Sequence, residues 1–154
     1  MKYLSIVTVV LGMALGGIFL AGVETASAGM EKYKVVNGTI PKSLTGKSGN
    51  AAKGEKLTIN RKKGNCLACH AISALAKQPF HGNVGPPLNG VGNRLTAAEI
   101  RMRIVNPKAV NPNTIMPAFY KSDGFHRLQK KWKGKTIIGA QDVEDIVAYM
   151  LTLK

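Results

Sequence analysis

The stretch "GNCLACHAIS", residues 64–73, contains both cysteines of this 154-residue chain and one of its three histidines. Two residues separate Cys66 from Cys69, and His70 follows directly. Three kinds of site use such a pattern: a thiol–disulfide redox pair, part of a zinc site, and the covalent attachment site of a haem. The remaining sequence has to decide between them.

A redox pair or a simple disulfide explains this pattern poorly. A redox pair of this spacing is expected within a thioredoxin-like fold of alternating strands and helices. The chain has no run of alternating β-branched residues that would form such strands. A disulfide between Cys66 and Cys69 would close a very small loop and would add little stability. Neither alternative gives a reason for the histidine.

A zinc site is also a poor fit, because a structural zinc ion takes four protein ligands. Cys66, Cys69 and His70 supply three, and two of these are adjacent residues, which is awkward around one ion. His81 or His126 would have to be the fourth, and neither has zinc-finger spacing. In a C-x-x-C-H haem site, the cysteines form thioethers and the histidine binds the iron. The two cysteines therefore predict one haem c.

The N-terminus has the features of an export signal. Lys2 precedes an apolar run from Leu4 to Gly22, and residues 26–28 form an A-x-A cleavage pattern. These features predict a cleaved signal peptide over residues 1–28 and a periplasmic mature protein. The apolar run is almost long enough to span a bilayer, so an uncleaved anchor is the alternative. Export agrees with haem c attachment, which takes place outside the cytoplasm.

The chain is strongly basic, with 22 basic and 8 acidic residues and a net charge of +14. Removal of residues 1–28 takes away Lys2 and Glu24 and leaves the net charge unchanged. Such a charge bears on partners rather than on fold. An exported protein rarely meets nucleic acid, so an acidic protein partner or a small anionic substrate fits better. A generally basic solvated surface would account for the charge equally well.

The mature chain is long enough for one small domain only. Residues 29–48 are rich in Lys, Gly, Ser and Thr without a helical period, and predict an extended N-terminal arm on the domain surface. Residues 49–154 predict a single domain. Asn50 is a good N-cap for a first short helix that ends before Gly64. No internal repeat is present.

Two further helices are predicted. Thr96 to Glu99 forms a capping box that opens a helix, and Asn106-Pro107 ends it. The last helix has one apolar face: Val143, Ile146, Val147, Met150 and Leu151. Asp142, Glu144 and Asp145 lie near its first turn, where carboxylates favour the helix dipole. The sequence thus predicts an all-α, loop-rich domain of three to four short helices around one haem.

Met116 is the predicted second axial ligand of the iron. It lies in the loop "NPNTIMPAF", which Pro112 and Pro117 stiffen. Packing is the more natural role for Met102 and Met150, which lie on helices, and Met30 lies in the arm. Two histidines, His81 and His126, compete with Met116 for this position. A thioether ligand raises the reduction potential, and a six-coordinate iron has no vacant position. This combination predicts electron transfer.

The order of the motifs "CLACH", "GPPLNGVGNR", "IMPAF" and "VAYMLTL" resembles class I cytochromes c over residues 50–154. The resemblance implies their all-α fold. It also implies that the carbonyl oxygen of Pro86 accepts a hydrogen bond from the imidazole of His70. A glycine of the first helix should pack against an aromatic residue of the last, and Gly54 and Tyr149 occupy those places.

The longer stretches "FHGNVGPPLNGVGNR", "NPNTIMPAFY" and "QDVEDIVAYMLTLK" resemble the SoxX family of monohaem cytochromes. This resemblance implies a heterodimer with a SoxA subunit (L-cysteine S-thiosulfotransferase), which couples thiosulfate to a cysteine of the SoxYZ carrier. The SoxX chain would be a non-catalytic subunit that passes electrons to a downstream cytochrome c. Two competing functions are a stand-alone soluble electron shuttle, and a ligand sensor or peroxidase with a labile Met116.

Overall fold

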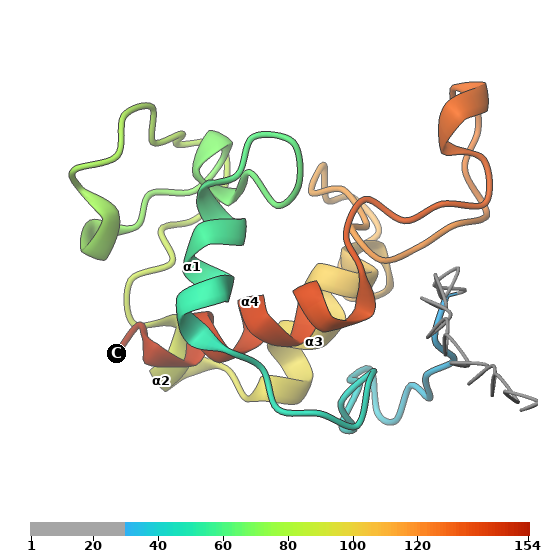
Figure 1. Cartoon of the computed structure of the whole chain (residues 1–154), viewed down its shortest axis with the longest axis horizontal. Helices are drawn as coiled ribbons and strands as arrows, with labels where there is room; N and C mark the ends of the chain where they lie inside the picture. The colour runs from blue at the N-terminus through green and yellow to red at the C-terminus, as the bar shows by residue number, and fades with distance from the viewer. Residues whose placement is uncertain (1–29) are drawn as a thin grey trace, which may run out of the picture.

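A computed structural model describes residues 30–154, in which four α-helices are joined by long loops (Figure 1). The helices are α1 (Ala51–Ile59), α2 (Val91–Arg94), α3 (Ala97–Val105) and α4 (Ala140–Thr152). Within these residues the only β-structure is an isolated bridge between Val36 and Thr39. The predicted all-α class is confirmed. The signal predicted for residues 1–28 lies outside the described residues.

The helices begin and end at the predicted signals. The side chain of Asn50 accepts a hydrogen bond from the backbone N–H of Lys53 (3.0 Å) and caps α1. Thr96 and Glu99 form the expected reciprocal capping box at the start of α3. Asn106 ends this helix, because the proline that follows disfavours helical backbone at the residue before it.

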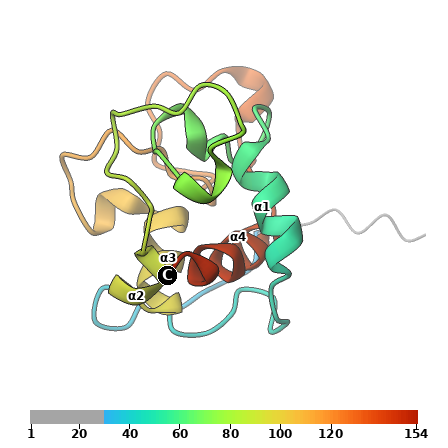
Figure 2. The ribbon, with the colours of Figure 1, turned by 90° about the vertical axis from the view of Figure 1, so that its left-hand side faces the viewer.

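Helix α1 crosses α4 at a point where both backbones come close (Figures 1 and 2). A Cβ atom on Gly54 would overlap the carbonyl oxygen of Asp145 and lie 2.8 Å from Cβ of Tyr149. Only glycine allows this approach, and the predicted contact between Gly54 and Tyr149 is confirmed. The short helix α2 packs at the other end of α4, where the N–H of Gly92 donates to the carbonyl of Leu153 (2.9 Å).

The apolar face of α4 is the centre of the core. Val143, Ile146, Val147 and Met150 are buried as predicted, whereas Leu151 is only half-buried at the edge beside α2. Helix α3 adds its own buried side chains to this core: Ile100, Met102, Ile104 and Val105. Among the described residues, no helix has the length and apolar character needed to cross a membrane.

A buried ion pair joins the N-terminal segment to α3 and α4. Arg101 donates two hydrogen bonds to the carboxylate of Glu144, both of 2.8 Å, and a third to the carbonyl of Ile40 (2.7 Å). The N–H of Leu44 donates to the same carboxylate (2.9 Å). Such a pair is tolerated in the interior because every charged atom has partners. Ile40 and Leu44 are thus core residues, although they belong to the predicted surface arm.

Two long segments rise on either side of α4. Figure 1 shows residues 64–90 in green on one side and residues 106–138 in orange on the other, and Figure 2 agrees. The cysteines and His70 belong to the first segment, and Met116 belongs to the second. The predicted ligands His70 and Met116 therefore belong to two different segments of the chain.

Candidate functional site

The cysteine motif forms a single tight helical turn, Cys66–Ala68. The carbonyl of Cys66 accepts hydrogen bonds from the N–H groups of Cys69 (3.1 Å) and His70 (2.9 Å). Residues at positions i and i+3 of such a turn lie above one another, which places Cys66 and Cys69 on one side of it. Leu67 is buried, with 4% of its surface exposed, and anchors the turn to the core.

The imidazole of His70 is fixed by Gly85 and Pro86. Its Nδ1 atom lies 2.7 Å from the carbonyl oxygen of Pro86, which can only accept, so Nδ1 carries the proton. This tautomer leaves the Nε2 lone pair available for a metal. A Cβ atom on Gly85 would lie 2.6 Å from Nδ1 and 2.9 Å from Nε2. The ring therefore lies against Gly85 so closely that any larger residue there would displace it.

The loop behind the motif is held by a second histidine. His81 accepts a hydrogen bond from the N–H of Ile72 at Nδ1 (3.2 Å), and its Nε2 lies 3.0 Å from the carbonyl of Leu75. Both ring nitrogens are therefore occupied within the loop. His81 thus has a structural role in this loop. Ile72 is fully buried and fixes the loop to the core.

No disulfide joins Cys66 and Cys69. Burial raises the pKa of the Cys66 thiol to about 11, although a hydrogen bond with Thr58 acts in the opposite direction. Redox-active cysteines have a lowered pKa, because the thiolate is the reactive form. The environment of Cys66 is therefore unsuited to thiol–disulfide exchange. Within residues 30–154, no three His, Cys, Asp or Glu side chains are grouped as a metal site.

The loop that carries Met116 is held by a lysine. The ammonium group of Lys108 donates hydrogen bonds to the carbonyls of Pro112 (3.2 Å) and Thr114 (2.8 Å). The hydroxyl of Thr114 accepts a hydrogen bond from the N–H of Met116 (3.2 Å). Met116 is half-buried, whereas the neighbouring Ile115 is 79% exposed. Local contacts thus shape this loop ahead of the methionine.

The remaining methionines have different surroundings. Met102 and Met150 are buried in the core cluster, with 2% and 4% of their surfaces exposed. Met30 is exposed and its sulfur lies 3.6 Å from the hydroxyl of Ser122. Packing therefore accounts for Met102 and Met150, as the sequence suggests. Met116 is the methionine in the stiffened loop opposite the cysteine motif.

The structure brings four of the five predicted site residues into one cluster: Cys66, Cys69, His70 and Pro86. Met116 comes from the separate segment across α4 (Figure 1). Sequence reasoning missed the role of Lys108, because an exposed lysine has no pattern that marks it. It also predicted a role for Pro86 alone in the Gly-Pro turn, whereas Gly85 leaves the space that the imidazole ring of His70 occupies.

The fold and the haem motif agree with one known family. The family model for cytochrome c matches residues 51–154. The chain belongs to the cytochrome c family. The predicted fold is thus confirmed, and so is the predicted cofactor, since this family holds haem c covalently through cysteine thioethers.

Individual relatives agree with this membership. A chain in the crystal structure of SoxXA from P. pantotrophus is 42% identical, with a TM-score of 0.74, and the match covers 79% of this cytochrome and 94% of that chain. This confirms the resemblance to SoxX. An uncharacterized lipoprotein of Aquifex aeolicus is 33% identical over 110 residues, which are 71% of this chain. Cytochrome c-550 of Bacillus subtilis is 31% identical over 88 residues, or 57% of this chain. The matches span only 41% and 64% of these two curated relatives.

The residues present fit a haem c. The glycine cradle and the Nδ1–H tautomer prepare His70 as an iron ligand. The hydroxyl of Tyr149 is buried and has no hydrogen-bond partner among the described residues. Burial raises its pKa, with contributions from Glu55 and Cys66. A buried hydroxyl without a partner, close enough to the predicted haem-tethering Cys66 for that thiol to affect its pKa, is what a site for a bound group would leave.

Proposed function

We propose that this cytochrome transfers electrons through one haem c, tethered by Cys66 and Cys69, with His70 and Met116 as axial ligands of the iron. The observation that carries the proposal is the 2.7 Å hydrogen bond from His70 Nδ1 to the carbonyl of Pro86. It fixes the tautomer and orientation of the ring before any metal binds. An imidazole that is held in this way before metal binding is typical of a residue that stays bound to its metal.

When bound, the haem supplies a one-electron redox centre. The side chains of the chain determine how that centre behaves. His70 and Met116 would hold the iron, and the thioether of Met116 would raise the reduction potential. With both residues bound to it, the iron would have no free position for dioxygen or a substrate. This arrangement favours electron transfer over catalysis.

We further propose that the cytochrome acts as the SoxX subunit of a SoxAX complex. The match to a SoxXA chain, which covers 94% of that chain at 42% identity, supports this. In the proposed complex, thiosulfate is coupled to a cysteine of the SoxYZ carrier, and the electrons pass through this subunit to a downstream cytochrome c. Cys66 and Cys69 are the only cysteines of the sequence, so none is left for sulfur transfer.

The proposed place of action is the periplasm, reached after cleavage of residues 1–28. A stand-alone electron shuttle is the second candidate, favoured by the 31% identity to cytochrome c-550 of Bacillus subtilis. The two candidates share the haem site and differ in whether a second subunit is bound.

Coexpression with a SoxA subunit separates the two candidates. The full chain, tagged at its C-terminus, is produced with that subunit in a host that carries haem-maturation machinery, and both are purified from the periplasm. Sedimentation and haem content then give the stoichiometry. A stable one-to-one complex is expected. A monomer at micromolar concentration, with full haem content, would contradict the subunit role while leaving electron transfer intact.

A further inference from the structure

Residues 121–135 form a strongly basic loop between two buried residues, Tyr120 and Ile138. This basic loop contains one acidic residue, Asp123, and six cationic ones: Lys121, Arg127, Lys130, Lys131, Lys133 and Lys135. None of the six is ion-paired with a carboxylate of the residues that the structure describes. From Asp123 to Lys135 every residue except Leu128 is exposed. The charge of the basic loop is therefore not used to hold the fold together and is open to a partner.

The basic loop projects from a fixed base. The carbonyl of Phe119 accepts hydrogen bonds from the N–H groups of Ile137 (3.0 Å) and Ile138 (3.2 Å), which closes the loop where it leaves the domain. Tyr120 and Ile138 are both 2% exposed and fasten this base to the core. Figure 1 shows the loop projecting on the side of α4 away from residues 64–90, and Figure 2 agrees. The basic loop is thus a separate surface from the one around the cysteine turn.

Two aromatic rings stand among the cations of the basic loop. Phe125 is 41% exposed and Trp132 is 37% exposed. The ammonium group of Lys121 lies 5.6 Å from the centre of the Phe125 ring, and that of Lys131 lies 5.9 Å from the Trp132 ring. Aromatic rings with basic side chains beside them are typical of segments that lie at a membrane surface, where the ring enters the boundary of the acyl chains and the cation meets the phosphates.

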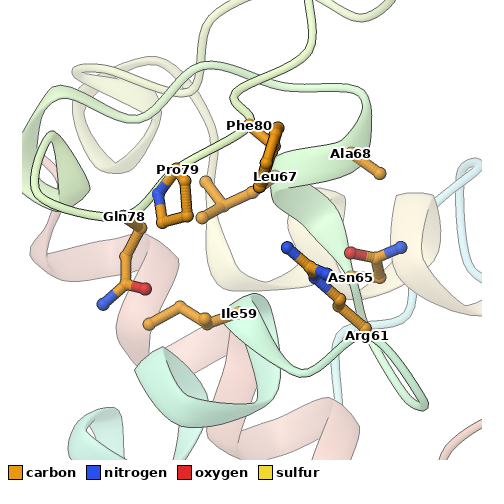
Figure 3. Close-up of a pocket in the computed structure, with 8 residues that line it drawn as sticks. All are labelled: Ile59, Arg61, Asn65, Leu67, Ala68, Gln78, Pro79 and Phe80. Carbon is orange, nitrogen blue, oxygen red and sulfur yellow. The ribbon is translucent and has the colours of Figure 1, made fainter.

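The shape of the basic loop also differs from the surface beside the cysteine turn. A hollow of about 330 Å³ lies beside that turn, and its lining includes Ile59, Leu67 and Phe80 (Figure 3). A hollow can receive a side chain of a partner protein, and closely matched relief is typical of protein interfaces. The basic loop instead spreads its charges over an exposed projection, which a flat and uniformly charged surface can meet. Its shape therefore favours a bilayer over a folded protein.

The N-terminal end of the described chain lies at the base of the basic loop. The N–H of Glu31 donates to the hydroxyl of Tyr120 (2.6 Å), and the sulfur of Met30 lies 3.6 Å from the hydroxyl of Ser122. In the sequence, the apolar run ends at Gly22, eight residues before Met30. Eight residues reach at most about 29 Å. An uncleaved chain would therefore hold the basic loop close to a bilayer, and a cleaved chain would have the loop alone.

We propose that the basic loop binds the surface of an anionic lipid bilayer. The lysine ammonium groups would pair with headgroup phosphates, and the rings of Phe125 and Trp132 would enter the boundary between headgroups and acyl chains. Because the loop lies away from residues 64–90, the bound cytochrome would keep its cysteine turn uncovered. The proposal goes beyond electron transfer and does not depend on it.

The test is cosedimentation of the holocytochrome, as a haem-maturation host releases it into the periplasm, with sucrose-loaded vesicles. One set of vesicles contains equal amounts of phosphatidylglycerol and phosphatidylcholine, and the other contains phosphatidylcholine alone. Haem absorbance in the pellet measures binding, which we expect only with the anionic vesicles and which should weaken as salt is added. One lysine near an anionic surface strengthens binding about fivefold, so the double variant Lys131→Gln and Lys133→Gln should bind about 25-fold more weakly.

The matched control is the double variant Lys53→Gln and Lys56→Gln, which removes the same charge from the exposed side of α1. It should bind like the wild type, and the visible spectrum checks that every variant is folded around its haem. An equal loss in both double variants would show that net charge alone acts and would overturn the proposal. Equal binding to both kinds of vesicle, or no binding to either, would also overturn it. Binding to polyaspartate without binding to vesicles would assign the basic loop to an acidic protein instead.

Discussion

The segment that carries His70 and the segment that carries Met116 are held by different kinds of contact. On the histidine side, Leu67, Ile72 and Leu75 are buried in the core, and backbone groups bind both histidines. On the methionine side, the exposed ammonium of Lys108 holds the loop through two carbonyls. The predicted ligand His70 therefore lies between core residues, whereas the predicted ligand Met116 is held on its N-terminal side by Lys108 at the surface and is anchored in the core only from Tyr120 onward.

This difference teaches which ligand can be lost without loss of the cofactor. Disturbing the histidine side disturbs the turn that carries both tethering cysteines. In the proposed site, disturbing the methionine side would leave both cysteine tethers intact and change only which groups bind the iron. Buried, fully packed elements open at a cost near the global stability, whereas surface loops open at a much smaller cost.

The largest effect is expected from Gly85→Ala. The added Cβ would overlap the imidazole of His70, so the ring must leave its place. Displacement of a group that orients a metal ligand costs about 10- to 100-fold in metal affinity or activity, so haem content should fall by roughly tenfold. Pyridine haemochrome absorbance per mole of protein measures this.

Gly139→Ala serves as the control for that substitution, because a Cβ there would meet nothing closer than a carboxylate oxygen of Asp142 at 3.7 Å. It should retain its haem. Full haem content and an unchanged spectrum in Gly85→Ala would show that the His70 imidazole can move without loss of haem. That result would contradict the claim that the histidine segment is the less tolerant of the two.

Met116→Leu should keep the haem but lower the reduction potential. Leucine has a similar volume and cannot bind iron, and axial ligands set haem potentials over a span of about 0.8 V. Carbon monoxide should also bind to the reduced variant. Potentiometric titration measures the change, with Met150→Leu, a core substitution, as the control. An unchanged potential in Met116→Leu would remove Met116 from the site.

Lys108→Met should weaken the hold on Met116 without removing it. The variant loses the donors to Pro112 and Thr114, so the loop opens more often. For an exposed charged contact worth about 0.5–1 kcal/mol, added imidazole should displace the methionine about two- to fivefold more readily. Spectral titration with imidazole checks this, and Lys121→Met is the matched control. Identical imidazole affinities would mean that Lys108 does not position the loop.

The smallest effect concerns the start of α3, the helix that leads into the methionine segment. Hydrogen bonds from the backbone and hydroxyl of Thr96 lower the pKa of Glu99. A depressed folded pKa stabilises the protein above the unfolded pKa, and this contribution is lost as the pH falls through the folded value. Glu99→Gln should therefore slightly lower the denaturation midpoint at pH 7 and have no effect at pH 2. An equal effect at both pH values would contradict this.

Sequence alone predicted the parts of the molecule that depend on local pattern. The spacing of Cys66, Cys69 and His70 is itself the geometry of one helical turn, and the caps at Asn50 and Thr96 act within three residues. Such features require no knowledge of the tertiary fold. They were enough to predict helices α1, α3 and α4 and the cofactor, but not the short helix α2.

Contacts between distant residues were missed for a physical reason. Glu144 was interpreted as a dipole-compensating carboxylate, but it is buried against Arg101, 43 residues away. The apolar residues Ile40 and Leu44 enter the core from a segment without periodicity. The local hydrogen bonds from Lys108 to the carbonyls of Pro112 and Thr114 were also missed, because nothing in the sequence distinguishes this lysine from the others of a basic chain.

The central claim is that His70 and Met116 hold the haem from opposite sides. Its most direct test is NMR of the reduced holocytochrome with ¹³C-labelled methionine methyl groups, compared among the wild type, Met116→Leu, Met102→Leu and Met150→Leu. A methyl group bound at the iron lies over the haem ring and is shifted strongly upfield. We predict one such resonance, absent only in Met116→Leu. Its persistence in that variant, or its absence from the wild type, would contradict the claim.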